Sequence, residues 1–186
     1  MNDSSKVSFG KPKATGAVWI APAGTALPTD GTTTLAAAFK GLGYVSEDGM
    51  VNGVETDTES VKAWGGDTVL TDQTSFAETF TINLIETNEE TLKFYYGPDN
   101  VTVDSETGAI TVRQNAKALP EHVIVFETVM TGNRVKRIVI PRGKIADRSG
   151  EITYVDNKAI AYPCKIAAFP SSVDGDYHKE YIATVA

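Results

Sequence analysis

Hydrophobic and polar residues alternate along much of the chain, and strict alternation predicts half-buried β-strands. The clearest such segment covers residues 76–84. One face of this predicted strand carries large apolar side chains, while the other carries Ala77, Thr79, Thr81 and Asn83. The apolar positions are Phe76, Phe80, Ile82 and Leu84. We expect this face to lie in the core.

Two further strand-like segments, residues 122–130 and 134–140, flank Thr131-Gly132-Asn133, which is a strong hairpin signal. A second hairpin is expected around residues 104–108, because short β-like segments stand on both sides. Other strands are expected at residues 17–21, 42–47, 53–63, 100–103, 109–113, 152–155, 159–169 and 177–184. The pattern predicts a mainly β, antiparallel fold, built as a sandwich or a partly closed barrel.

A single helix is expected after residue 86. Thr87 and Glu90 match the T-x-x-E capping box, in which the hydroxyl and the glutamate each bind a free backbone amide of the first turn. Gly97 stands where a C-terminal cap is wanted, and Pro98 cannot continue a helix. Leu92, Tyr95 and Tyr96 share one helical stripe.

Glu86, Glu89 and Glu90 could be interpreted as paired catalytic carboxylates. Carboxylates at a helix N-terminus are also favoured by the helix dipole, by about 0.3–1 kcal/mol each. No histidine or nucleophile lies near them in sequence. We therefore predict that these glutamates are structural.

The chain of 186 residues is long enough for one domain with a substantial core. Residues 1–16 are polar and interrupted by Gly10, Pro12 and Gly16, so they are expected to form an extended arm. Residues 17–186 are expected to form a single β-rich domain. No secretory signal or membrane-spanning apolar run is found, which favours synthesis in the cytoplasm without export and no membrane partner.

Candidate chemistry is sparse. His122 and His178 lie far apart in sequence, and two histidines without a cysteine cluster argue against a catalytic zinc site. Cys164 stands in an apolar segment, where a small buried thiol is the simpler interpretation. No nucleophile elbow, P-loop or HExxH motif occurs. We predict no catalytic residues, no metal and no cofactor.

The formal net charge is −7, which disfavours a protein that grips nucleic acid by neutralising phosphates. Glu55, Asp57 and Glu59 share one face of the strand expected at residues 53–63. Their spacing covers roughly 13 Å, at about 3.3 Å per residue, which suits a continuous acidic surface better than one catalytic centre.

Three segments resemble the major tail proteins, or tail tube proteins, of long non-contractile-tailed bacteriophages. They read LGYVSEDGM at residues 42–50, VETDTESVKAWGGDTV at 54–69, and FTINLIETNEETLKFYYG at 80–97. The order and spacing of "YVSEDG", "AWGGD" and "LIETNEETLKFYYG" carry the resemblance. It covers residues 42–100 well, and the rest only in its β-rich character.

The resemblance implies a β-sandwich or barrel flanked by a helix, similar to the tube protein of type VI secretion systems. It implies hexameric rings that stack into a virion tail tube, through which double-stranded DNA leaves the capsid without being held tightly. The implied partners are further copies of the chain, a tape measure protein, a tail terminator and tail-tip proteins. Such a subunit is made in the host cytoplasm.

Within that hypothesis, Glu55, Asp57 and Glu59 would line an acidic lumen wall, or else pair with basic residues of an adjacent ring. The arm and the loop from Trp64 to Gln73 are expected to form contacts between subunits, with the residues Phe9, Lys11, Lys13, Trp64 and Asp67. The alternative is a carbohydrate- or surface-binding β-sandwich of a virion. That alternative needs exposed aromatics clustered in one groove, whereas the aromatics here are spread along the chain.

Overall fold

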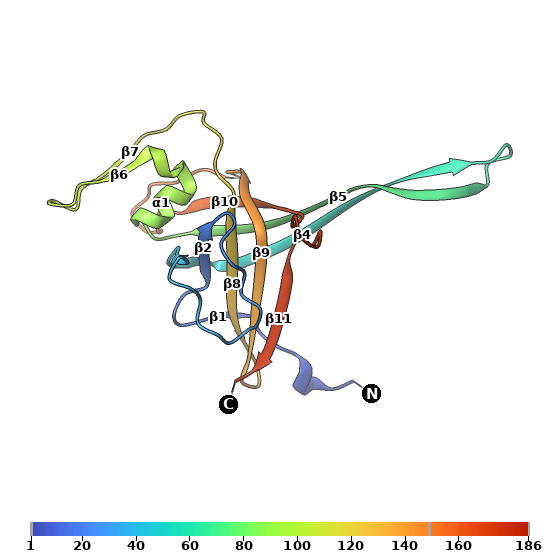
Figure 1. Ribbon diagram of the computed structural model, residues 1–186, viewed down its shortest axis with the longest axis horizontal. Helices are drawn as coiled ribbons and strands as arrows, with labels where there is room; N and C mark the ends of the chain where they lie inside the picture. Colours follow the sequence, from blue (N-terminus) through green and yellow to red (C-terminus); the bar gives the residue numbers. More distant parts are fainter. Residues whose placement is uncertain (1, 149, 186) are drawn as a thin grey trace.

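A nine-stranded antiparallel sheet dominates the computed structural model, which describes residues 2–148 and 150–185 (Figure 1). The strand order is β3-β2-β8-β9-β10-β5-β4, with β1 added beside β8 and β11 beside β9. The strands are β1 (Lys11–Pro12), β2 (Val18–Pro22), β3 (Lys40–Gly41), β4 (Val45–Lys62), β5 (Thr68–Leu84), β8 (His122–Met130), β9 (Arg134–Asp147), β10 (Tyr162–Phe169) and β11 (Lys179–Thr184). The sheets are antiparallel and do not close into a barrel, so the fold is mainly β and sandwich-like.

The sheet divides into two layers along β9. Residues 134–139 of this strand pair with β11, whereas residues 142–147 pair with β10. Pro141 lies where the partner changes, at a register shift against β8 between His122 and Ile124. Proline has no backbone N–H to donate, so it fits a point where the ladder is interrupted. The strands β10, β5 and β4 then run across β8 and β11 (Figure 1).

The main core lies between these layers and under the helix. Phe80 of β5 stacks on Phe126 of β8, with ring centroids 5.6 Å apart. The apolar face predicted for residues 76–84 is buried from Phe80 to Leu84, whereas Phe76 remains exposed. Leu92 and Tyr95 of the helix α1 (Glu89–Tyr96) complete this core.

A second, smaller core covers the other face of β8. Val123, Val125 and Val139 pack there against Phe39, which belongs to the long connection between β2 and β3. This connection, residues 23–39, contains no helix or strand and lies over the sheet. Something other than a backbone ladder must hold it in place.

The helix was predicted correctly, but its N-terminal cap was not. Asn88 is the N-cap, and its side-chain oxygen accepts a hydrogen bond from the Thr91 N–H at 2.8 Å. Thr87 instead shares a hydrogen bond with the Tyr162 hydroxyl at 3.0 Å. Asparagine is as good a cap as threonine, so the helix begins one residue later than the Thr87–Glu90 pattern suggested. Gly97 ends it with a positive φ of 97°.

Glu86 is structural, as predicted. Its carboxylate accepts hydrogen bonds from the Tyr44 N–H at 2.8 Å and from the Asn88 side chain at 3.0 Å. The carboxylate lies so close to Gly43 that a Cβ there would meet it at 2.3 Å. Gly43 has a φ of 78°, which also favours glycine. Glu86 therefore ties the chain before β4 to the start of the helix.

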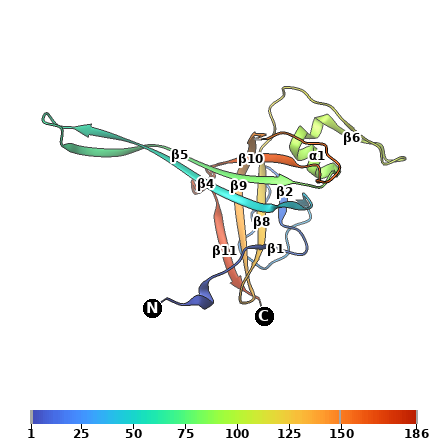
Figure 2. The same cartoon turned by 180° about the vertical axis from the view of Figure 1, so that it is seen from behind.

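Several strand predictions need correction. The turn expected at Asp48-Gly49 is a bulge within β4, which resumes pairing at Met50. Residues 152–155 form no strand. The hairpin around residues 131–133 is confirmed, as is the small separate one formed by β6 (Val101–Val103) and β7 (Ile110–Val112). In both views, this small hairpin and the β4–β5 hairpin project towards opposite ends of the molecule (Figures 1 and 2).

Candidate functional site

The β4–β5 hairpin extends far beyond the body of the protein (Figures 1 and 2). The 18 residues of β4 span about 60 Å at about 3.3 Å per residue. Every residue from 54 to 77 is exposed, and the chain itself leaves both faces of this outer half open except at Phe76, whose ring packs edge-on against Tyr177. The exposed large apolar side chains include Val54, Val61, Trp64, Val69, Leu70 and Phe76. Val61 and Leu70 are ladder partners, and with Trp64 and Val69 they lie at the outer end of the hairpin, where clustered exposed apolar side chains mark an interaction site.

One face of the projecting hairpin is acidic. Glu55, Asp57 and Glu59 alternate along β4, and Asp72 of β5 is the ladder partner of Glu59. Partners across an antiparallel ladder point to the same side, so Asp72 is a fourth carboxylate on this face. Within residues 2–148 and 150–185 none of the four forms a salt bridge, although Ser75 donates a hydrogen bond to Asp57 at 2.7 Å.

A tight turn closes the tip of the hairpin. The Ala63 N–H donates to the Asp67 carbonyl at 2.8 Å, and the Gly66 N–H donates to the Ala63 carbonyl at 3.0 Å. Gly65 and Gly66 both have positive φ, which permits the turn. Trp64 is fully exposed, with a relative accessibility of 107%. The loop ends at Asp67 rather than at Gln73, because β5 begins at Thr68.

The N-terminal arm runs along the body. The Phe9 N–H donates to the Thr131 hydroxyl at 3.3 Å, and Lys11 pairs with Val129 of β8. The Phe9 side chain is nevertheless 76% exposed. Lys13 points back to its own subunit, where its ammonium contacts Glu127 at 3.2 Å. The arm is therefore attached through β1 and Lys13 while Phe9 and Lys11 face solvent.

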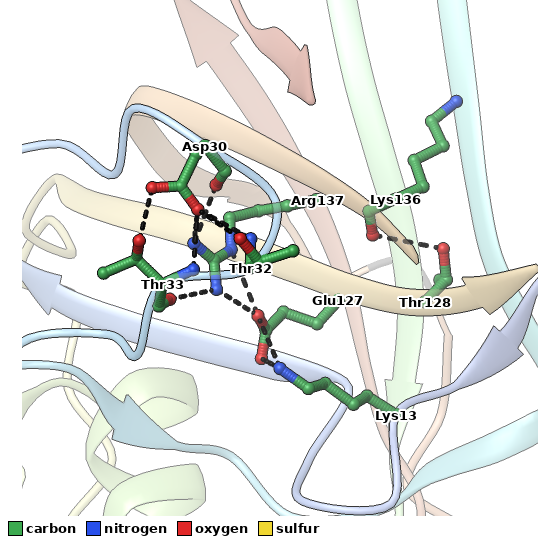
Figure 3. A network of polar contacts seen from close by, with 8 residues as sticks. All are labelled: Lys13, Asp30, Thr32, Thr33, Glu127, Thr128, Lys136 and Arg137. Atoms are coloured by element: carbon green, nitrogen blue, oxygen red, sulfur yellow. Dashed lines mark hydrogen bonds and ion pairs between the residues drawn. The ribbon is translucent and has the colours of Figure 1, made fainter. Parts of the chain in front are cut away.

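A buried polar network joins this arm to the long connection over β8 (Figure 3). Arg137 and Glu127 are ladder partners on β9 and β8, and the guanidinium contacts the carboxylate at 2.5 Å. Arg137 also donates to the carbonyls of Asp30 and Thr33, both at 2.8 Å. Lys13 lies on the other side of Glu127. One buried ion pair thus fixes the long connection, which has no ladder of its own, and holds the arm beyond its short ladder with β8.

The turn at Asp30 is stabilised locally. Its carboxylate accepts hydrogen bonds from the side chain and N–H of Thr33 and from the N–H of Thr32. These bonds, that of the Thr33 hydroxyl foremost, hold the pKa of Asp30 well below its usual range. The turn presents the two carbonyls that Arg137 binds.

Another buried carboxylate lies at the root of the hairpin. Glu78 is 3% exposed, and its oxygens contact His178 Nδ1 at 2.8 Å and Asn52 Nδ2 at 2.9 Å. His178 precedes β11, so the contact links the two layers where the hairpin leaves the body. Glu78 has a structural role, because it lies on β5 and binds Asn52 of β4 and His178 before β11.

A groove of about 700 Å³ lies between the arm and the start of β4. Residues 10–18 form one wall and residues 43–50 the other. Phe126 and Thr128 of β8 also line it. The titratable residues that line the groove are Lys13, Tyr44, Glu47 and Glu86, of which Lys13 is paired with Glu127 and Glu86 accepts the Tyr44 N–H.

The described residues contain no group of three or more His, Cys, Asp or Glu side chains that could hold a metal ion. His122 lies under Phe94, and burial lowers its pKa. Cys164 is buried, as predicted, and burial raises the pKa of its thiol to about 12. No helix in the described part of the chain is long and apolar enough to span a bilayer.

The sequence matches the family described as "Phage tail tube protein" over residues 3–179. The chain belongs to this family. None of the curated proteins compared with it matches its sequence. Membership confirms the resemblance inferred from residues 42–100, and extends it over almost the whole chain.

A tail tube protein is a structural component of the phage tail, which favours a role in assembly rather than catalysis. In this light the structure separates the expected contact residues into two groups. Trp64 and Asp67 lie at the tip of the projecting hairpin, whereas Phe9, Lys11 and Lys13 lie on the arm beside the body (Figures 1 and 2). Their role in contacts between subunits stays a prediction.

Sequence reasoning missed the residues of the buried networks, although signals for them exist. Glu127 interrupts the apolar run of β8, and Arg137 directly precedes the apolar run at residues 138–140 of β9. A hairpin centred on Gly132 places these two positions opposite each other. Glu78 likewise occupies the apolar face of β5.

Proposed function

We propose that this chain assembles into hexameric rings that stack into the phage tail tube, and that the tube conducts double-stranded DNA out of the capsid. The hexameric number follows from the family resemblance and not from a feature of the single subunit. Further copies of the chain are the main partner. A tape measure protein, a tail terminator and tail-tip proteins would contact the tube along its length and at its ends.

The projecting β4–β5 hairpin is the observation that carries the proposal. Residues 54–77 are exposed on both faces and include six large apolar side chains. A two-stranded hairpin is marginally stable alone in water, so a long one with apolar surface is suited to be covered by other subunits. The outer edge of β4 is unpaired in the described part of the chain, and an unpaired edge is a template for pairing.

The acidic hairpin face suits a conduit for DNA. Four carboxylates that form no salt bridge within the described residues repel phosphate, whereas a basic wall would gain affinity by releasing counterions and would slow the passage of DNA. We propose that Glu55, Asp57, Glu59 and Asp72 contribute to the lumen wall. Pairing of these residues with a basic surface of the adjacent ring is the alternative.

Negative-stain electron microscopy of the purified protein over a concentration series tests assembly. Rings or hollow tubes are expected, either spontaneously or after addition of the phage's tail-initiation complex. Subunits that remain monomeric at every concentration, with and without that complex, would contradict the proposal.

A hairpin truncation tests the observation on which the proposal rests. In the variant, residues 58–74 are replaced by Asn-Gly, which joins the ladder partners Asp57 and Ser75 by a two-residue turn. The monomer should unfold at the same urea concentration as the wild type, because the removed residues contact no core. It should form no tubes. Full assembly of this variant would show that the hairpin is dispensable.

Deletion of residues 2–13 tests the arm separately. The monomer should stay folded, since Arg137 still pairs with Glu127 when Lys13 is removed. Tube formation should be impaired, and a deletion variant that polymerises fully would count against a role for the arm.

A further inference from the structure

We propose that the Trp64 turn of one subunit inserts into the groove between the arm and the start of β4 of a second copy of this chain. The inference rests on the proposed function, because it names the surface that receives the hairpin. It defines a donor surface, the turn at residues 62–68, and an acceptor surface, the groove walls at residues 10–18 and 43–50.

The donor turn has the features of an interface anchor. Tryptophan is enriched among the residues that dominate binding energy, and Trp64 is fully exposed in the subunit. The two backbone hydrogen bonds from Ala63 and Gly66 hold the turn in one shape. Little conformational freedom is therefore lost when it binds.

The acceptor groove matches an aromatic side chain. Its volume of about 700 Å³ is within the range of natural ligand sites. Tyr44, Val45 and Met50 supply accessible apolar surface on the β4 wall, whereas Val18 and Phe126 of the main core form the buried floor. Small residues such as Ala14, Gly16 and Gly49 leave the walls open.

Charges on the two surfaces are complementary. Lys62 precedes the turn on β4, and Asp67 precedes β5, so the turn carries one positive and one negative side. The groove carries Lys13, which is paired with Glu127, and the carboxylates Glu86 and Glu47, of which Glu86 is bound by the Tyr44 N–H and Glu47 can receive a cation. Lys62, Asp67 and Glu47 are exposed, and none forms a salt bridge within residues 2–148 and 150–185. Placing Lys62 beside Glu47 puts Asp67 beside the arm wall.

One subunit cannot fill its own groove. Met50 in the groove wall and Lys62 at the turn stand at opposite ends of the same ladder, about 40 Å apart at about 3.3 Å per residue. Figures 1 and 2 show the turn at the end of the long axis and β1 on the body. A contact between two different surfaces of identical subunits is heterologous, and such contacts generate rings or filaments.

Removal of the anchor is the first test. Trp64→Ala should raise the critical concentration for tube formation, followed by sedimentation and electron microscopy, by at least about tenfold. Tyr154→Ala is the matched control, because Tyr154 is also exposed but lies outside both surfaces. Circular dichroism should give the same spectrum for both variants. Assembly of Trp64→Ala at the wild-type concentration would overturn the proposal.

A charge exchange identifies the acceptor. Lys62→Glu and Glu47→Lys should each raise the critical concentration, whereas the double variant should regain at least half of the loss on the logarithmic scale. Lys158→Glu, an exposed lysine in another loop, controls for the change in net charge. If the increases in critical concentration simply add in the double variant, Lys62 and Glu47 are not paired. Wild-type protein that never forms tubes would instead contradict the proposed function, so the two failures are distinguishable.

Discussion

At the scale of single residues, Arg137 determines whether the face of β8 opposite the main core stays covered. It is 1% exposed, pairs with the buried Glu127, and binds two carbonyls of the long connection. Arg137→Met should lower the free energy of unfolding by about 3–5 kcal/mol, because it leaves a buried carboxylate without its main partner. Urea unfolding of the monomer measures this loss.

The neighbouring Lys136 provides the control for that experiment. It pairs with Glu180 at 2.6 Å, but both side chains are partly exposed. Lys136→Met should therefore change the free energy of unfolding by no more than about 1 kcal/mol. Equal effects of the two substitutions would show that burial of the Arg137–Glu127 pair is unimportant.

Cys164 should be chemically inert in the folded subunit. Burial raises the pKa of its thiol from 9.0 to about 12, so the reactive thiolate is rarer in the folded chain than in the unfolded chain. We expect no reaction with an aromatic disulfide reagent at pH 8 until denaturant is added. Ser105→Cys, in the exposed turn between β6 and β7, should react at once and serves as the control. Rapid labelling of native Cys164 would contradict its burial.

The raised pKa of Cys164 also makes the folded subunit less stable at high pH. The unfolded thiol ionises near pH 9, while the folded thiol remains protonated until about pH 12. The stability associated with the neutral buried thiol is thus fully present below about pH 9 and is lost as the pH rises through this window.

At the scale of elements, the helix start depends on one residue. Asn88 accepts the Thr91 N–H, which would otherwise lack a partner in the helix. Asn88→Ala should lower the free energy of unfolding by about 0.5–2 kcal/mol, and Asn88→Ser should lower it less, because serine caps equally well and adds no charge beside the Glu86 carboxylate. Chemical unfolding of the two variants checks this. A larger loss for Asn88→Ser than for Asn88→Ala would refute the assignment.

Elements defined by local chemistry were predictable from the sequence, and those defined by distant partners were not. The range 122–130 of β8 and the hairpin turn after it were predicted correctly, because Thr131-Gly132-Asn133 specifies both. Asp48-Gly49 is equally compatible with a turn or a bulge, and only pairing of Met50 with Ile82 decides between them. Residues 152–155 have strand-like composition, but no strand in the described chain pairs with them.

The acidic face of the hairpin was likewise only partly predictable from the sequence. Alternation alone placed Glu55, Asp57 and Glu59 together. Asp72 joins them through a register shift between Asp57 and Thr58, where β5 contains one extra residue. A sequence pattern on one strand does not reveal such a shift in its partner.

At the scale of the whole molecule, the acidic face of the hairpin has a proposed role in DNA passage, whereas the hairpin tip has a proposed role in assembly. The subunit has a formal net charge of −7, and four carboxylates lie together on a face that no part of its own chain covers. If this face lines the lumen, replacing Glu55, Asp57 and Glu59 by Gln, Asn and Gln should leave tube assembly unchanged. DNA ejection should slow, because the weakened repulsion allows phosphates to approach the wall.

A phage carrying the triple variant allows both quantities to be measured, tail length by electron microscopy and DNA release by dye fluorescence. The matched control carries Asp99→Asn, Asp104→Asn and Glu106→Gln, which remove the same charge from the opposite end of the subunit. Slow release with normal tails in the triple variant alone would support the lumen wall. Defective tails would support pairing with an adjacent ring instead, since a repulsive wall is not needed for stacking. Normal tails with normal release would exclude both roles for this face.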